Sequence, residues 1–113
     1  MSSCLFCQIA AGERPAVIVY RGDDVIAIRD INPQAPTHIL ILPTKHIASL
    51  AEMTREDEGL LGRLIAVAKA IAEQQDLSKG YRLVINTGPQ GGQTVHHLHV
   101  HLLGGRAMHW PPG

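Results

Sequence analysis

Three histidines alternate with aliphatic residues near the C-terminus, in the segment His97-Leu98-His99-Val100-His101. Because successive side chains of a β-strand point to opposite faces, this spacing predicts a strand with three imidazoles on one face and an apolar face that suits a core. Histidine is the side chain whose ordinary pKa lets it act as base, acid or nucleophile near neutral pH. Since a Gly91-Gly92 pair lies just upstream, the segment is typical of a reaction site.

Length and charge narrow the class of protein. The 113 residues indicate one domain spanning residues 1–113, and the ten basic residues balance the ten acidic ones. No broad basic field for nucleic acid is predicted, so a nucleotide would be bound as a small molecule. The sequence has no basic start followed by an apolar stretch and no apolar run near the ~20 residues of a membrane span, so we expect a cytoplasmic protein that does not bind membranes.

The hydrophobic pattern predicts an α+β fold: an antiparallel sheet with one long helix and a short N-terminal helix. Five strands are expected at residues 17–20, 25–28, 38–42, 81–86 and 95–103. The short helix is expected at residues 5–11. The long helix is expected to start at a Thr54 cap and to run to about Gln75, because apolar residues recur there at helical spacing.

Two other interpretations of the histidine strand are open. The rings could be solvated on an open sheet face, or they could form a metal centre. In a regular strand His97 and His101 lie ~13 Å apart, whereas metal–nitrogen bonds are ~2.1 Å, so these two rings cannot share one ion. Adjacent members could do so with a third ligand from elsewhere.

Several segments together resemble one known family. They are HLHVHLL at residues 97–103, DINPQAPTH at 30–38, PTKHI at 43–47, GGQTV at 91–95 and MHWPPG at 108–113. These segments are similar to the histidine triad (HIT) superfamily, and to its Hint branch in particular. The resemblance implies a HIT-like fold and hydrolysis of purine nucleoside 5′-phosphoramidates.

The resemblance also implies catalytic roles. His99 would attack the α-phosphorus to form a nucleotidyl-histidine, which water then hydrolyses. His101 would hydrogen-bond the phosphoryl oxygens, and His97 would belong to the proton network around His99. Thr94 would be the hydroxyl near the leaving group, where many Hint relatives carry serine. His38 is either a fourth ring of this cluster or a satisfied buried histidine.

The expected nucleotide contacts come from two loops. Asp30 would accept hydrogen bonds from the ribose hydroxyls, although it could simply be a turn residue, and Ile31 would line a base slot. Asn86 resembles a family residue near the phosphate. Gly92 and Gln93 would border the phosphate together with Thr94, His99 and His101, because glycine lets backbone N–H groups come close. The expected ligands are AMP, GMP and their phosphoramidates.

Cys4 and Cys7 form a C-x-x-C pair with three interpretations. They could be a redox pair, although the expected βαβ context is missing, or two inert thiols. The resemblance adds a structural zinc held by Cys4, Cys7, His46 and His97, the set found in some bacterial HIT proteins. In that case His97 is a ligand and not a proton shuttle. The expected reaction itself needs no cofactor.

The C-terminal residues 110–113 could be a frayed end. The resemblance instead implies a homodimer in which this tail lies near the partner's active site. Competing functions are a non-catalytic nucleotide sensor, a zinc-dependent hydrolase, a scaffold with vestigial activity and a dinucleoside polyphosphate hydrolase of the same superfamily.

Overall fold

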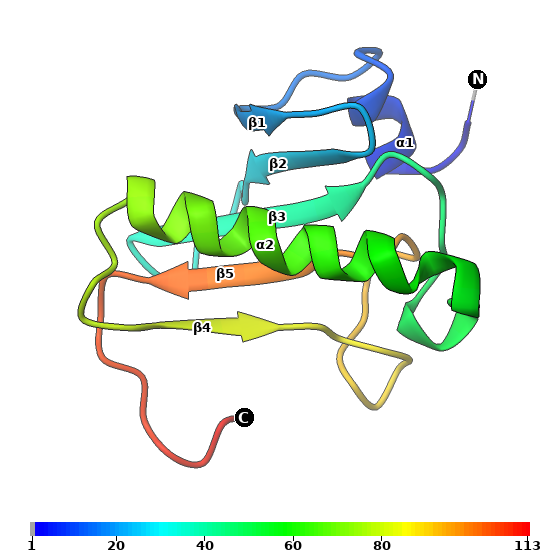
Figure 1. Ribbon diagram of the computed structural model, residues 1–113. Coiled ribbons are helices and arrows are strands. Elements are labelled where there is room, and N and C mark those ends of the chain that lie inside the picture. The colour runs from blue at the N-terminus through cyan, green and yellow to red at the C-terminus, as the bar shows by residue number, and fades with distance from the viewer. Residues whose placement is uncertain (1) are drawn as a thin grey trace.

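In the computed structural model, which describes residues 2–113, five antiparallel strands form one sheet in the order β1-β2-β3-β5-β4 (Figure 1). The strands are β1 (Ile18–Arg21), β2 (Val25–Arg29), β3 (Thr37–Pro43), β4 (Tyr81–Val84) and β5 (Val100–Gly104). Two α-helices, α1 (Leu5–Ala10) and α2 (Glu58–Gln74), accompany them. Two 3-10 turns, η1 (Leu50–Glu52) and η2 (Arg55–Asp57), precede α2. The predicted α+β fold is therefore confirmed.

The long helix α2 runs across one face of the sheet (Figure 1). Its buried side chains recur at helical spacing: Leu60, Leu64, Ala68, Ile71 and Ala72. They share one core cluster with Ile39 and Ile41 of β3 and with Val100 and Leu102 of β5. The helix begins at Glu58 rather than at Thr54, because residues 55–57 form a 3-10 turn in which the Asp57 carboxylate accepts the Thr54 backbone N–H at 2.9 Å.

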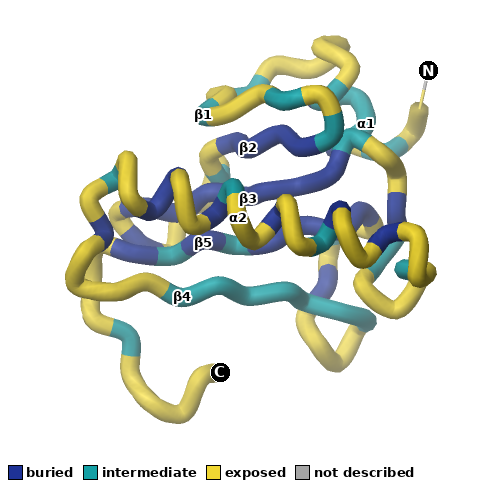
Figure 2. Tube along the Cα trace, viewed as in Figure 1, coloured by how far each residue is buried: buried dark blue, intermediate teal, exposed yellow. Residues whose placement is uncertain are grey.

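The opposite face of the sheet is covered in part by α1. Phe6 and Ile9 of this helix pack with a second apolar cluster that contains Ile26 and Ile28 of β2 and Leu40 and Leu42 of β3. Every residue of β3 is buried, as Figure 2 shows, because it is the central strand and has packed side chains on both faces. This explains why its sequence is almost continuously apolar.

The last strand starts later than the sequence predicts. The expected strand at residues 95–103 begins only at Val100, and residues 95–99 lie outside the ladder. In the register that pairs Ile41 with Val100, Leu98 would face Pro43. Proline has no N–H to donate, so the ladder stops there. Leu98 N donates instead to Ile47 O, at 2.7 Å.

The edge strand β4 is also shorter than predicted, since it ends at Val84 and not at Asn86. After β5 the chain turns back toward β4 (Figure 1). The guanidinium of Arg82 donates to the carbonyl oxygens of His109 and Pro112, at 3.0 and 3.1 Å, and ties down this C-terminal segment. No helix formed by residues 2–113 has the length and apolar character needed to cross a membrane.

Candidate active site and metal cluster

The alternation of the histidine segment survives even though its first two rings precede β5. Leu98, Val100 and Leu102 belong to the core cluster under α2. On the other side, the ring of Phe6 in α1 meets the rings of His97 and His99 edge-on, with centroids 5.8 and 5.1 Å away. The imidazoles and the aliphatic residues therefore segregate as the sequence predicts.

His99 is held by the backbone of its neighbour. Its Nδ1 lies 2.7 Å from the carbonyl oxygen of His97. A carbonyl only accepts hydrogen bonds, so Nδ1 carries the ring proton and Nε2 of the neutral ring keeps its lone pair. Burial lowers the pKa of His99 from its ordinary value, and this favours the neutral ring. His99 thus offers an unprotonated Nε2, which is the form required of a nucleophile.

The neutral rings of His38 and His101 carry their proton on Nε2, whereas His99 carries its proton on Nδ1. The backbone N–H of Gln34 donates to His38 Nδ1 at 3.0 Å, so the proton of the neutral His38 ring is on Nε2. That Nε2 lies 2.9 Å from His101 Nδ1, which must therefore accept. In the neutral His101 ring the proton is then on Nε2, and this nitrogen is a donor for an anionic ligand.

Both rings of this pair are kept neutral by their surroundings. Burial, followed by the nearby His99 and His38 rings, lowers the pKa of His101 to about 4. Burial also lowers the pKa of His38, and the opposing effect of the Asp30 charge is smaller. His38 is 5% exposed, and the bonds to Gln34 and His101 occupy both of its ring nitrogens. The structure thus combines the two interpretations of His38: it is a satisfied buried ring and a member of the cluster.

Asp30 lies at the edge of this cluster, directly after β2. One carboxylate oxygen accepts the Asn32 backbone N–H at 2.8 Å, which is the turn role considered from the sequence. The other oxygen lies 3.4 Å from His38 Nε2. Each carboxylate oxygen has further lone-pair capacity, so the group can still accept a hydroxyl. Ile31, the expected base contact, is 99% exposed on the following loop.

The glycine-rich loop is braced from within. Asn86 Nδ2 donates to Gly91 O at 2.7 Å, and Gly92 has a φ of +81°. The amide of Gln93 donates to the carbonyls of Ala48 and Val95 and accepts the N–H of Gly88. Gln93 therefore stabilises the loop, and its expected place beside the phosphate stays a prediction. Thr94, directly after it, is exposed.

Four donors meet behind the histidine segment. The Nδ1 atom of His97 lies 3.3 Å from Cys4 Sγ, 3.5 Å from Cys7 Sγ and 3.2 Å from His46 Nδ1, and Cys7 Sγ lies 3.3 Å from His46 Nδ1. Zinc bonds of about 2.0–2.1 Å to nitrogen and 2.3 Å to sulfur would separate tetrahedral donors by about 3.3–3.8 Å. The donor cluster Cys4/Cys7/His46/His97 therefore has the types and spacing that zinc prefers.

The second nitrogen of His97 supports this assignment. His97 Nε2 lies 2.8 Å from the carbonyl oxygen of Pro43, so it carries the proton and leaves Nδ1 as a bare lone pair toward the donor cluster. A backbone carbonyl on the far nitrogen is the usual outer partner of a metal-bound histidine. Pro43, which follows the apolar strand expected at residues 38–42, thus also supplies the outer partner of His97.

A second group of possible ligands, Asp30, His38 and His101, has its donor atoms within 4.8 Å of one another. Protonation argues against a metal there. His38 Nδ1 already accepts a backbone N–H, so its Nε2 could bind a cation only as an imidazolate. We therefore interpret this group as a hydrogen-bonded chain.

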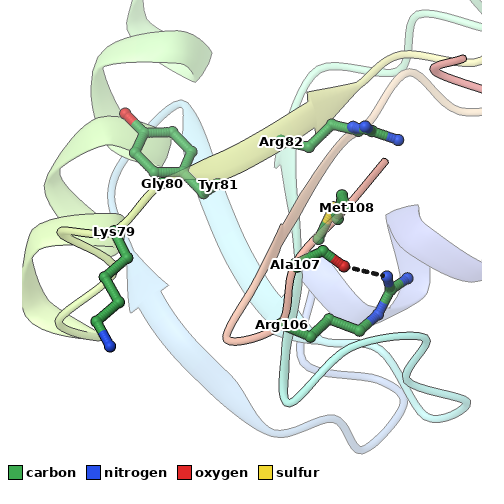
Figure 3. A pocket seen from close by; sticks show the side chains of 7 residues that line it. All are labelled: Lys79, Gly80, Tyr81, Arg82, Arg106, Ala107 and Met108. Carbon is green, nitrogen blue, oxygen red and sulfur yellow. Dashed lines mark hydrogen bonds between the residues drawn. The ribbon is translucent and has the colours of Figure 1, made fainter. Parts of the chain in front are cut away.

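A cavity of about 360 Å³ lies elsewhere, between the start of β4 and the C-terminal segment (Figure 3). Its two arginines are already paired with backbone carbonyl groups. Arg106 donates to the carbonyl oxygens of Gln34 and Ala107, and Arg82 is bound as described above. None of the predicted site residues lines this cavity.

Comparison with known proteins identifies the family. The HIT domain model matches residues 11–108. A 14 kDa zinc-binding protein of Zea mays is 52% identical over 114 residues, covering 99% of this chain and 89% of that protein. Adenylylsulfatase HINT1 of Arabidopsis thaliana is 46% identical over 114 residues, covering 99% of this chain and 78% of that protein. The crystal structure of a HIT family hydrolase from Legionella pneumophila superposes with a TM-score of 0.96 at 53% identity, covering 98% of this chain and all of that one.

The chain therefore belongs to the HIT domain family, as its motifs predicted. The family model includes the histidine segment and begins after the N-terminal cysteines, at residue 11, whereas the match to the Zea mays protein extends over 99% of the chain.

Proposed function

We propose that this protein hydrolyses purine nucleoside 5′-phosphoramidates to nucleoside monophosphates through a covalent nucleotidyl-His99 intermediate. The observation that carries the proposal is the hydrogen bond from His99 Nδ1 to the carbonyl oxygen of His97, which leaves Nε2 free and unprotonated. The HIT family hydrolases among the structural neighbours support a hydrolytic activity.

In the first step, His99 Nε2 attacks the α-phosphorus and the P–N bond breaks. The departing nitrogen takes a proton, which we assign to the exposed Thr94 hydroxyl or to solvent next to it. His101 donates its Nε2–H to a phosphoryl oxygen, where charge grows in the transition state. His99 keeps its own Nδ1 proton throughout, so the intermediate is a phosphorylated imidazolium, which is a good leaving group.

In the second step, water attacks the phosphorus and the bond to His99 Nε2 breaks. The water oxygen remains in the nucleoside monophosphate, and its surplus proton replaces the one given to the amine, at Thr94 or in the solvent next to it. Overall, phosphoramidate and water give amine and monophosphate. Asp30 would accept from the ribose hydroxyls. The N–H groups of Gly91 and Gly92 already donate to the carbonyl oxygens of Gly88 and Pro89, at 3.2 and 3.1 Å, so they brace the loop and are not assigned to the phosphate.

We also propose that zinc fills the donor cluster Cys4/Cys7/His46/His97. A relative named as a zinc-binding protein supports this proposal, together with the donor spacing. Four protein ligands leave zinc no open position, so the ion would stabilise the fold and not activate water. Under this proposal His97 is a ligand, and the proton network of the reaction consists of His38, His99 and His101.

A direct test incubates the full chain with adenosine 5′-phosphoramidate and follows AMP release and covalent adduct by mass spectrometry. Wild-type protein should release AMP and show an adenylyl adduct after rapid quenching. His99→Ala should lose both, whereas His96→Ala, an exposed histidine in the same segment, should retain both. Nucleotide binding without adduct or turnover would favour the competing sensor function.

A second candidate substrate is adenylyl sulfate, because one relative is named an adenylylsulfatase. The two substrates make different demands on the site. Sulfate leaves as an anion without a proton, whereas an amine must be protonated as its bond breaks. Thr94→Val should therefore slow phosphoramidate hydrolysis more than adenylyl sulfate hydrolysis, and equal effects on both would remove Thr94 from the proposed proton transfer.

We further propose a homodimer in which the exposed outer edge of β4 and the adjacent C-terminal segment meet a second copy. An unpaired edge strand invites such pairing. Sedimentation equilibrium of the full chain would test it: we expect the mass of two chains, and the mass of a single chain would contradict the dimer.

A further inference from the structure

His97 connects the donor cluster to the candidate nucleophile. Its Nδ1 faces Cys4, Cys7 and His46, and its Nε2–H is bound by Pro43 O. The backbone carbonyl of the same residue accepts the Nδ1–H of His99 at 2.7 Å. A single residue therefore belongs to both sites, through its side chain on one side and its main chain on the other.

The β-ladder does not hold this carbonyl in place. Residues 95–99 precede β5, and the ladder with β3 ends at Ile41 and Val100. The backbone is anchored beside His97 by the bond from Leu98 N to Ile47 O. The His97 carbonyl and the Leu98 N–H belong to one planar peptide unit, so this bond also orients the carbonyl. Ile47 directly follows His46, so the unit is held between two members of the donor cluster, His46 and His97.

Helix α1 provides a second connection. Cys4 is its N-cap residue, Cys7 lies in its first turns, and Phe6 between them packs edge-on against the rings of both His97 and His99. A helix of six residues is marginal by itself. Linking its two cysteines to His46 and His97 would fix the helix and, with it, the aromatic surface against which His99 rests.

We propose that metal occupancy of the donor cluster sets the position and tautomer of the His99 ring, with His97 and Phe6 acting as positioning residues for the reaction. The inference rests on the proposed function for its catalytic meaning, but the effect on the ring is independent of it. A purely structural cluster would change the stability of the fold and leave His99 as it is.

The test compares zinc-loaded full-length protein, the metal-depleted protein and the Cys4→Ser/Cys7→Ser variant. Long-range proton–nitrogen NMR spectra report the tautomer of His99, with its signal assigned by its loss in His99→Ala. Kinetics with adenosine 5′-phosphoramidate give kcat and KM separately. Leu64→Ala is the matched control, since it opens a cavity under α2, on the far face, and keeps all four donors. Circular dichroism checks that each sample is folded.

We expect the loaded protein to show a single tautomer with the proton on Nδ1, and the two unloaded samples to show an exchanging mixture. We expect kcat to fall about ten-fold without zinc, the size typical of losing an outer partner of a reactive histidine, with little change in KM. Leu64→Ala should be less stable but keep the single tautomer and nearly normal kcat. If the double variant does not fold, Cys7→Ser, which retains three donors, replaces it.

The failures are distinguishable. A loaded protein that changes tautomer with zinc but hydrolyses no phosphoramidate keeps the positioning inference and removes the proposed function. If the protein hydrolyses phosphoramidate but neither the His99 tautomer nor kcat changes with zinc, the proposed function stands and the positioning inference is overturned. A chain that takes up no zinc, or a Leu64→Ala control that reproduces both effects, overturns the inference.

Discussion

His38 and His101 share one hydrogen bond, from His38 Nε2–H to His101 Nδ1 at 2.9 Å, and its direction is fixed by a backbone group outside the pair. The backbone N–H of Gln34 donates to His38 Nδ1 and so determines which nitrogen is protonated in both rings. Through this chain, a main-chain N–H in the loop before β3 makes His101 Nε2 a donor.

This relationship predicts the effect of His38→Phe. The substitution leaves His101 Nδ1 without its donor, so the ring can adopt the tautomer that does not donate to phosphate. We expect kcat for the phosphoramidate to fall about 100-fold, the lower end of a general acid–base contribution. His38→Gln, whose amide can both accept from Gln34 and donate to His101, should recover part of the rate. Equal loss in both variants would contradict the role assigned to the hydrogen bond.

The histidine pKa values predict an acid-tolerant reaction. Burial lowers the pKa of His99 and brings the pKa of His101 to about 4, so both rings stay neutral below pH 6.5, where an ordinary histidine becomes protonated. We expect kcat to stay nearly level as the pH falls through 6.5 and to decline only at lower pH, as these two rings become protonated. Turnover should be measured across this window after subtraction of uncatalysed hydrolysis. A fall of kcat with its midpoint at pH 6.5 would show that burial does not keep these two rings neutral.

The glycine-rich loop predicts contrasting effects of two glycine substitutions. A Cβ at Gly91 would clash with the backbone carbonyl oxygen of Thr87, so Gly91→Ala must displace backbone that the Asn86 and Gln93 amides brace. We expect a higher KM and a lower free energy of unfolding. Gly62 lies at an exposed position of α2, and a Cβ there would meet nothing within 4 Å. Gly62→Ala should therefore stabilise the fold by about 1 kcal/mol. Chemical denaturation and steady-state kinetics would check both variants.

The two ligand groups predict one zinc ion per chain and not two. The donor cluster should bind zinc, and His46→Ala should weaken binding because it removes one of four ligands. The Asp30, His38 and His101 group should bind none, since the His38 nitrogen that faces it is protonated. Elemental analysis after exhaustive dialysis measures the stoichiometry. Two ions in the wild type, or one in a variant lacking both cysteines, would contradict this assignment.

Local sequence pattern was sufficient for much of the architecture. The period of apolar residues in α2, the continuous apolar run of β3 and the alternation around His99 each encode which face a residue presents, because side-chain direction follows from backbone geometry. The boundaries were less accurate. The late start of β5 depends on which residue of β3 lies opposite Leu98, and that residue is a proline whose effect appears only once the register is known.

By itself, the sequence determined the chemistry that the chain carries: alternating imidazoles, paired thiols and a glycine-rich loop, together with the family to which they belong. Tertiary structure decided which nitrogen of each imidazole is protonated and which histidine belongs to which site. The physical reason is that a ring's tautomer is set by the partner of its other nitrogen. For His38, His97 and His99 these partners are the amide of Gln34 and the carbonyls of Pro43 and His97, main-chain groups whose positions no residue type specifies.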